Sequence, residues 1–233
     1  MRPIWGRPAV EISVGGERWI LVADLHVGYE MELAAQGFYV PDQSEKILEK
    51  LLSLGRADGL FIAGDLKHSV AFTGVGVRRF LEGVSRRFRR IEIVLGNHDG
   101  GLHRLAGEKV VIHGARGAPL GDVWVFHGHA YPSEESSSYD FGIMGHVHPS
   151  VMIRGLGRVP VWVVGDSVCE NLPRTIILIP AFNELIGYGD VLNPGDYGPI
   201  FPRCLDPEST DVLTLEGDYL GTLSFLAGTG KLI

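Results

Sequence analysis

Short, nearly continuous runs of apolar residues recur along the chain. Seven of them are rich in Val and Ile: RWILVAD from Arg18, GLFIAGD from Gly59, IEIVLGN from Ile91, VWVFHG from Val123, FGIMGH from Phe141, VPVWVVGD from Val159 and TIILIP from Thr175. Runs without regular polar alternation are typical of strands that are covered on both faces. The pattern therefore predicts buried strands at these seven places.

Helical patterns lie between the first three runs. Asp42 is the expected N-cap of a helix that stops at Gly55, because Glu45 follows at the capping-box spacing. Its apolar stripe is formed by Ile47, Leu48, Leu51 and Leu52. A second helix is expected from Gly76 to Arg89, with Phe80, Leu81, Val84 and Phe88 as its inner face. The first half thus alternates strand and helix, which favours parallel strands.

The second half has consecutive strands joined by loops or single helical turns. Hairpins are expected at both ends of the chain, turning at Gly15-Gly16 and near Gly217. No repeat, low-complexity tract or linker divides the sequence. We therefore expect one domain over residues 1–233, with two packed sheets and helices outside.

Composition narrows the possibilities further. The chain has 233 residues, 45% of them hydrophobic, and a formal net charge of −7, which argues against a broad nucleic-acid surface. Two cysteines, Cys169 and Cys204, are too few for a disulfide framework and form no CxxC pair. No apolar stretch reaches the length of a membrane span, and the N-terminus lacks the apolar region of a signal peptide. The expected location is the cytoplasm.

Polar residues that can bind metals follow five of the apolar runs. They are Asp24 and His26, then Asp65 and His68, then Asn97, His98 and Asp99, then His127 and His129, and finally His146 and His148. Each pair alone is explained as well by turn chemistry. Together they account for seven of the nine histidines, whereas His103 and His113 are expected to be structural. Because ligands bind outside the carboxyl ends of strands in α/β sheets, we expect the five ends to meet in one cleft.

The donor types indicate the chemistry. Carboxylates, imidazoles and one amide, without thiolate, suit Mn²⁺, Fe or Zn²⁺ better than a structural zinc site. Mn²⁺ is the favoured ion, with Ni²⁺ and Co²⁺ as further candidates. Seven or eight donors are too many for one ion and fit two ions that share a carboxylate, the usual arrangement for phosphoryl displacement.

The ordered motifs D-x-H, G-D, G-N-H-D, H-G-H and G-H-x-H resemble those of the calcineurin-like metallophosphoesterase superfamily, over residues 24–148. Within it, DLHVGYE, GDLKH and PAFNELIGY are similar to the ICC-like or DNA-ligase-associated phosphoesterases. The resemblance implies a four-layer α/β/β/α sandwich, in which two mixed β-sheets are flanked by helices. It also allows an association with DNA-repair proteins.

The resemblance further implies a role for each residue. Asp24, His26 and His148 would hold the first metal, Asp65 would bridge both, and Asn97, His127 and His146 would hold the second. His98 would face the substrate, and Asp99 would hold the far nitrogen of its ring. His129 would contact the phosphate or support a ligand. His68 stands where the family often has an acid or amide, which leaves its role open.

The predicted function is a dinuclear metal-dependent phosphodiesterase that uses a metal-bridging hydroxide. The alternatives are a phosphomonoesterase or nucleotidase, a nuclease for short single strands, and a non-catalytic metal-binding scaffold. The substrate is a phosphate ester, with a nucleotide or a short single-stranded nucleic acid among the candidates. The basic run RRFRR at 86–90 is interpreted first as a solvated helix face and second as a phosphate-tracking patch.

Two other segments are candidates for the rim of the cleft. Residues 28–41, GYEMELAAQGFYVP, follow the first motif directly and are the candidate lid. After His148, the polar candidates are Asp166, Asn183 and Glu184, for which turn chemistry is the alternative explanation.

Overall fold

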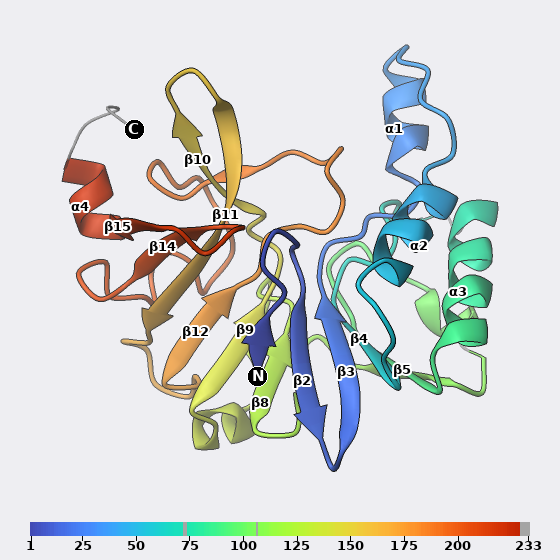
Figure 1. Ribbon diagram of the computed structural model, residues 1–233, viewed down its shortest axis with the longest axis horizontal. Helices are drawn as coiled ribbons and strands as arrows, with labels where there is room; N and C mark the ends of the chain where they lie inside the picture. Colours follow the sequence, from blue (N-terminus) through green and yellow to red (C-terminus); the bar gives the residue numbers. More distant parts are fainter. Residues whose placement is uncertain (72–73, 106, 229–233) are drawn as a thin grey trace.

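The computed structural model describes residues 1–71, 74–105 and 107–228. Its strands form two sheets that face each other, with α2 and α3 on the outside of the first (Figure 1). All seven predicted strands are present, and the predicted α/β class with two mixed sheets and flanking helices is confirmed.

The first sheet has six strands in sequence order. They are β1 (Arg2–Pro3), β2 (Val10–Val14), β3 (Glu17–Val22), β4 (Gly59–Ala63), β5 (Arg90–Val94) and β6 (Val110–His113). The β2–β3 pair is the hairpin expected at Gly15-Gly16, and β3 to β6 run parallel. The parallel crossovers contain α1 (Tyr29–Ala35), α2 (Ser44–Leu52) and α3 (Val75–Arg87).

The second sheet has nine strands. Its path runs through β13 (Gly189–Asp190), β10 (Pro149–Ile153), β11 (Gly157–Asp166), β12 (Thr175–Leu178), β9 (Phe141–Met144), β8 (Val123–Phe126) and β7 (Ala118–Leu120). The predicted hairpin around Gly217 adds β14 (Asp211–Thr214) beside β11 and β15 (Tyr219–Thr222) beside β14. The short helices η1 (Leu102–Leu105) and η2 (Glu134–Ser138), and α4 (Leu223–Gly228), complete the elements.

Side chains alternate between two buried faces, which explains the continuous apolar runs. In β3, Ile20 and Val22 pack towards α2 and α3, whereas Trp19 and Leu21 pack between the sheets. The inner layer of the second sheet includes Trp162. Its outer face is covered by α4 and by segment 200–205.

Two local details differ from the sequence-based prediction. The N-cap of α2 is Gln43, one residue after Asp42, yet the Asp42 carboxylate still accepts a hydrogen bond from the Ser44 N–H at 2.8 Å. Cys169 and Cys204 form a disulfide with a Cα–Cα distance of 5.0 Å, which their spacing did not indicate. The disulfide joins the loop after β11 to segment 200–205.

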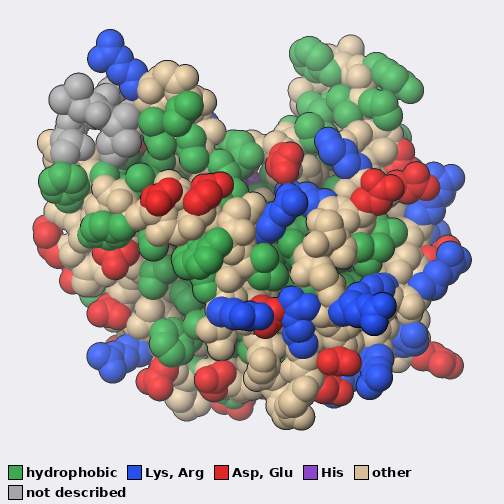
Figure 2. Space-filling model, in the orientation of Figure 1, with side chains coloured by type: hydrophobic (Ala, Val, Ile, Leu, Met, Phe, Trp, Pro, Cys, Tyr) green, Lys and Arg blue, Asp and Glu red, His purple; other side chains and the backbone are tan. Residues whose placement is uncertain are grey.

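The basic run lies at the edge of the first sheet where β5 begins. Phe88 is buried, and Arg90 forms an ion pair with Glu17 and lies over the Trp19 ring. Lys and Arg side chains gather along this lower edge and on the α3 side (Figure 2). Because the metal-binding candidates follow the carboxyl ends of the strands, the run lies at the opposite edge, which disfavours a phosphate-tracking role.

Within the described ranges, none of the helices combines the length and the apolar character needed to cross a lipid bilayer.

Candidate metal centre

The carboxyl ends of β3, β4, β5, β8 and β9 bring the predicted polar residues together. Five of them adopt positive φ angles between 42° and 71°: Asp24, His26, Asp65, His146 and His148. Such angles are uncommon for residues other than Gly and cost free energy, and they concentrate at functional sites. The strand exits are therefore bent in a way that turns these side chains towards one another.

Asp24, His26 and His148 form one group of candidate ligands. The His148 Nε2 lies 3.5 Å from the Asp24 Oδ1, and the His148 Nδ1–H donates to the carbonyl oxygen of Gly187 at 2.8 Å. That hydrogen bond places the proton on Nδ1 of a neutral imidazole, so the Nε2 lone pair faces the Asp24 carboxylate.

Asp65, His127 and His146 form a second group, to which Asn97 belongs by distance. The His127 Nε2 lies 3.2 Å from the Asn97 Oδ1 and 3.3 Å from the Asp65 Oδ2. The His127 Nδ1–H donates to the Ala63 carbonyl oxygen at 3.0 Å, so in a neutral ring Nε2 again presents a lone pair.

Asp65 stands between the two groups. Its Oδ2 lies 3.3 Å from the His127 Nε2 and 3.4 Å from the His26 Nε2. The His26 Nε2 is buried and has no hydrogen-bond partner. A single carboxylate oxygen of Asp65 is thus about equally close to one imidazole nitrogen of each group.

These contacts set acceptors against acceptors. With neutral imidazoles, carboxylate oxygens, an amide oxygen and imidazole lone pairs face each other at 3.2–3.5 Å, an arrangement that metal ions or added protons between them make favourable. Ligand atoms bound at about 2.0–2.2 Å to one ion stand roughly 3.0–3.5 Å apart. The residues therefore fit two divalent cations, and the second hydrogen bonds of His127 and His148 orient them as metal-bound histidines usually are.

Without cations, protons take that place. Burial alone would lower the pKa of His127, but Asp65 and Asp24 raise it to about 9. Burial would raise the pKa of Asp65, and His127 and His26 instead hold it well below its usual range. Burial lowers the pKa of His26 to about 3 and that of His146 to about 4, so both stay neutral and able to bind a metal at neutral pH.

Two glycines of the motifs allow the ligands to approach the backbone. A Cβ on Gly64, whose φ is +87°, would lie 2.2 Å from the His127 Nδ1. A Cβ on Gly96 would lie 2.1 Å from the Asp65 Oδ1. Only glycine fits at either position without displacing a candidate ligand.

His98 lies beside the first group, 5.0 Å from His26 between ring centroids. Its backbone N–H donates to the Asp65 Oδ1 at 2.9 Å, and its Nδ1–H donates to the carbonyl oxygen of His68. The Nε2 is therefore the nitrogen left for a substrate.

Asp99 has different partners from those predicted. Its carboxylate accepts hydrogen bonds from the backbone N–H groups of Gly96 at 2.9 Å and Lys67 at 3.1 Å, whereas the His98 ring is held by the His68 carbonyl. Asp99 thus ties the second motif to the third, and the expected contact with the His98 ring is corrected. The buried Lys67 ammonium strengthens the same junction by donating to the carbonyl oxygens of His98 and Val70.

His68 connects the first group to α1. Its Nδ1 lies 3.1 Å from the His26 Nδ1, and its Nε2 contacts a carboxylate oxygen of Glu32. If Nε2–H donates to Glu32, the His68 Nδ1 accepts the His26 Nδ1–H, which leaves the His26 Nε2 free towards Asp65. Sequence reasoning missed Glu32, because nothing in the helix pattern distinguishes it from other exposed acids.

Of the three remaining histidines, one lies beside the candidate ligands and two lie elsewhere. The His129 ring lies 5.2 Å from that of His127, and its buried Nδ1 has no hydrogen-bond partner. His113 stacks on Phe61 and pairs with Glu92, and His103 lies in η1, so neither is in the candidate site.

The region after His148 contributes through its backbone and one amide. Asn183 is buried, donates to the Leu25 carbonyl oxygen at 3.0 Å and supports the first motif. Gly187 orients His148. Glu184 pairs with Lys50, and Asp166 accepts from the Thr175 hydroxyl, so these two have structural partners.

Comparison with known proteins supports the fold. No model of a protein family matches the sequence. No curated protein matches it either. Among solved structures, the crystal structure of Pseudomonas putida nuclease MPE is similar, with a TM-score of 0.56 and 20% sequence identity over 91% of this chain and 100% of that chain. At this identity the likeness establishes a shared fold.

Proposed function

We propose that the protein is a dinuclear metal-dependent phosphoesterase that acts on phosphodiesters. The observation that supports it best is the position of the Asp65 Oδ2, equally close to the unpartnered His26 Nε2 and to the His127 Nε2. In a structural metal site the ligands would close around one ion. Here two ligand groups share one carboxylate and open towards His98 and His129.

Each ligand group has its role in this proposal. Asp24, His26 and His148 hold the first ion, and Asn97, His127 and His146 hold the second, with Asp65 between them. Two such ions supply Lewis-acid activation of water and of the phosphate oxygens at neutral pH. We favour Mn²⁺ because the donors are oxygen and nitrogen without thiolate.

The histidines that are not ligands act on the substrate. His98 presents its Nε2, since its Nδ1–H is held by the His68 carbonyl oxygen. As an imidazolium it donates a hydrogen bond to the phosphate and a proton to the departing alkoxide. His129 lies against the second ligand group and contacts the phosphate from the other side.

The nuclease remains the second candidate, because a nuclease is among the proteins that share the fold. Two observations argue against duplex DNA as the substrate. The net charge is −7, and the basic run 86–90 lies at the edge of the sheet opposite the candidate metal centre. A short single-stranded nucleic acid needs a smaller basic surface for binding, and it is itself a phosphodiester, so it is compatible with the proposal.

The test is turnover by the Mn²⁺-loaded protein of bis(p-nitrophenyl) phosphate, p-nitrophenyl phosphate and a short single-stranded oligonucleotide. We expect the diester to be hydrolysed faster than the monoester, with activity lost after chelation and restored by Mn²⁺. Preference for the monoester would favour a phosphomonoesterase. Bound metal without turnover of any of the three would favour the non-catalytic scaffold.

A further inference from the structure

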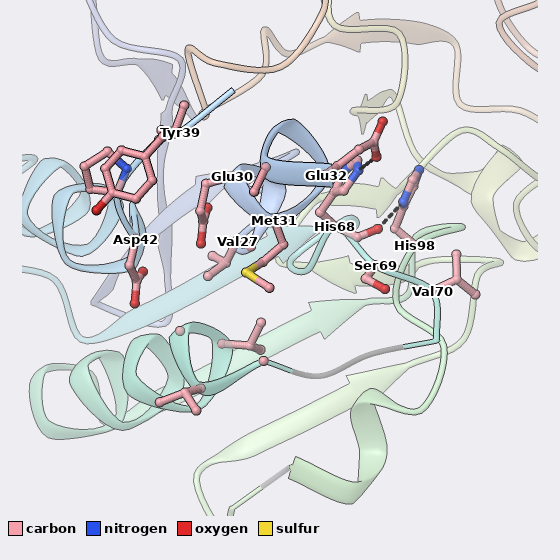
Figure 3. A pocket seen from close by; sticks show the side chains of 18 residues that line it. Val27, Glu30, Met31, Glu32, Tyr39, Asp42, His68, Ser69, Val70 and His98 are labelled. Carbon is pink, nitrogen blue, oxygen red and sulfur yellow. Dashed lines mark hydrogen bonds and ion pairs between the residues drawn. The ribbon is translucent and has the colours of Figure 1, made fainter. Parts of the chain in front are cut away.

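A groove of about 900 Å³ adjoins the candidate metal centre. His68 and His98 line one end of it, and the walls come from segment 27–42, from residues 69–70 and from the start of α3. Figure 3 shows Glu32, His68 and His98 at one end, Val27, Glu30 and Met31 in the middle, and Tyr39 and Asp42 at the other end. The segment interpreted as a lid from the sequence therefore forms a wall of this groove.

The wall is apolar and open to solvent. Met31 is 70% exposed, Tyr39 89%, Val70 57% and Val75 64%, although all four line the same groove. Surface apolar residues are ordinary when scattered, but several that line one groove beside a candidate active site are typical of a ligand-binding surface.

The charges in the groove have one sign. Glu30, Glu32 and Asp42 line it, and none of the described residues that line it is Lys or Arg. Arg79 pairs with Asp42 from outside the lining, at 3.4 Å, and the Lys67 ammonium beneath it is bound by backbone carbonyl oxygens. Glu30 is 7% exposed and, among the described residues, forms no ion pair with a Lys or Arg side chain, so a second phosphate beside it would meet a carboxyl group without a paired basic residue.

We propose that this groove binds one ester group of a small phosphodiester, and that this group is apolar and carries no negative charge. The inference rests on the proposed function, since the phosphate is taken to lie at the metal centre beside His98. A polynucleotide running along the groove would bring a further phosphate against the carboxyl groups of Glu30 and Asp42, which line it. The acids therefore select against a polymer and in favour of a small diester.

The test is calorimetric binding of three phosphate monoesters, which are product analogues, to the Mn²⁺-loaded protein. Methyl phosphate measures the metal centre alone, 2-phenylethyl phosphate adds an apolar group, and 2-phosphoethyl phosphate adds a second charge. We expect 2-phenylethyl phosphate to bind ~10-fold more tightly than methyl phosphate, as for partial burial of a phenyl group. We expect 2-phosphoethyl phosphate to gain no comparable affinity.

Matched variants assign the preference to the groove. Val75→Asp places a carboxylate in the wall at the first residue of α3, where an acid is compatible with the helix. It should remove the preference for the phenylethyl ester, whereas Val168→Asp, at a site with 63% exposure outside the groove, should keep it. Glu30→Gln should improve binding of 2-phosphoethyl phosphate by roughly 3–5-fold, since one repelling charge is lost.

Equal binding of methyl and 2-phenylethyl phosphate by the wild type would overturn the inference, and that comparison needs no variant. So would tighter binding of 2-phosphoethyl phosphate than of the phenylethyl ester. Hydrolysis of bis(p-nitrophenyl) phosphate, measured in parallel, keeps the two proposals apart. A phenylethyl preference without hydrolysis would support the groove and reject the diesterase, and hydrolysis without the preference would do the reverse.

Discussion

Replacing Gly96 by alanine should damage the metal centre although no candidate ligand is itself replaced. The new Cβ would lie 2.1 Å from the Asp65 Oδ1 and 2.4 Å from the Asp65 backbone nitrogen. A carboxylate can rotate away, but the backbone nitrogen cannot, so the turn itself must shift. The Asp65 Oδ1 also accepts the His98 N–H at 2.9 Å, and that hydrogen bond would be lost with the movement.

Two effects of different size follow. Overpacking of a buried turn costs about 1–3 kcal/mol, which thermal unfolding of the metal-free protein measures. Displacing a residue that supports a ligand typically lowers metal affinity by roughly 10–100-fold. Because Asp65 faces both ligand groups, we expect both binding steps to weaken in a Mn²⁺ titration followed by calorimetry.

The matched control is Gly114→Ala, because a Cβ on Gly114 meets nothing within 4 Å and its φ is not positive. This variant should bind Mn²⁺ as the wild type does. If Gly96→Ala is stable and binds Mn²⁺ with the affinity of the control, Asp65 does not bridge the two groups in the way described here.

Three further predictions concern other parts of the site. His98→Ala should keep its metal ions and lose ~10²–10⁴-fold in turnover, more for an alkyl or nucleoside ester than for an aryl ester; metal loss in step with activity would make His98 a ligand. Glu32→Gln should weaken Mn²⁺ binding by up to roughly 10-fold, because His68 loses its charged hydrogen-bond acceptor. Glu32→Asp should restore part of the lost affinity. Unchanged Mn²⁺ affinity of the glutamine variant would reject the link from Glu32 through His68 to His26. In the metal-free protein, burial would lower the pKa of His127, but Asp65 raises it to about 9. Protonated His127 therefore adds to the free energy of unfolding, on the order of 3 kcal/mol. This contribution is complete below the unfolded pKa of about 6.5 and is lost as the pH rises through 9. Urea unfolding at pH 6.5 and 9 measures this loss, which Asp65→Asn should reduce, and stability that rises over this interval would contradict it.

The sequence predicted the strands and the convergence of their ends for a simple physical reason. A strand that is buried on both faces carries few polar side chains until it leaves the sheet, so the cluster of polar residues after each run marks its end. Five such ends with Asp, Asn and His identified the candidate ligands, and the parallel pairing of β3, β4 and β5 explains why Asp24, Asp65 and Asn97 lie at one edge.

Other parts of the site were beyond sequence reasoning. The carbonyl oxygens of Ala63, Gly187 and His68 orient three of the histidines, and every residue has such an oxygen, so only the fold distinguishes them. Asp99 does not contact the His98 ring as predicted, because its carboxylate accepts hydrogen bonds from two backbone N–H groups. The placement within the ICC-like group and the assignment of residues 1–233 to one domain stay predictions.

The most direct test of a dinuclear centre is the number of Mn²⁺ ions bound per chain, measured by elemental analysis after dialysis, for the wild type and for Asp65→Asn. Asparagine keeps the shape of the side chain but removes the charge that faces both His26 and His127. The wild type should hold two ions, as two-metal phosphoryl-transfer sites do, and Asp65→Asn should hold fewer than one. Two ions in both proteins, or a single ion in the wild type, would contradict the account.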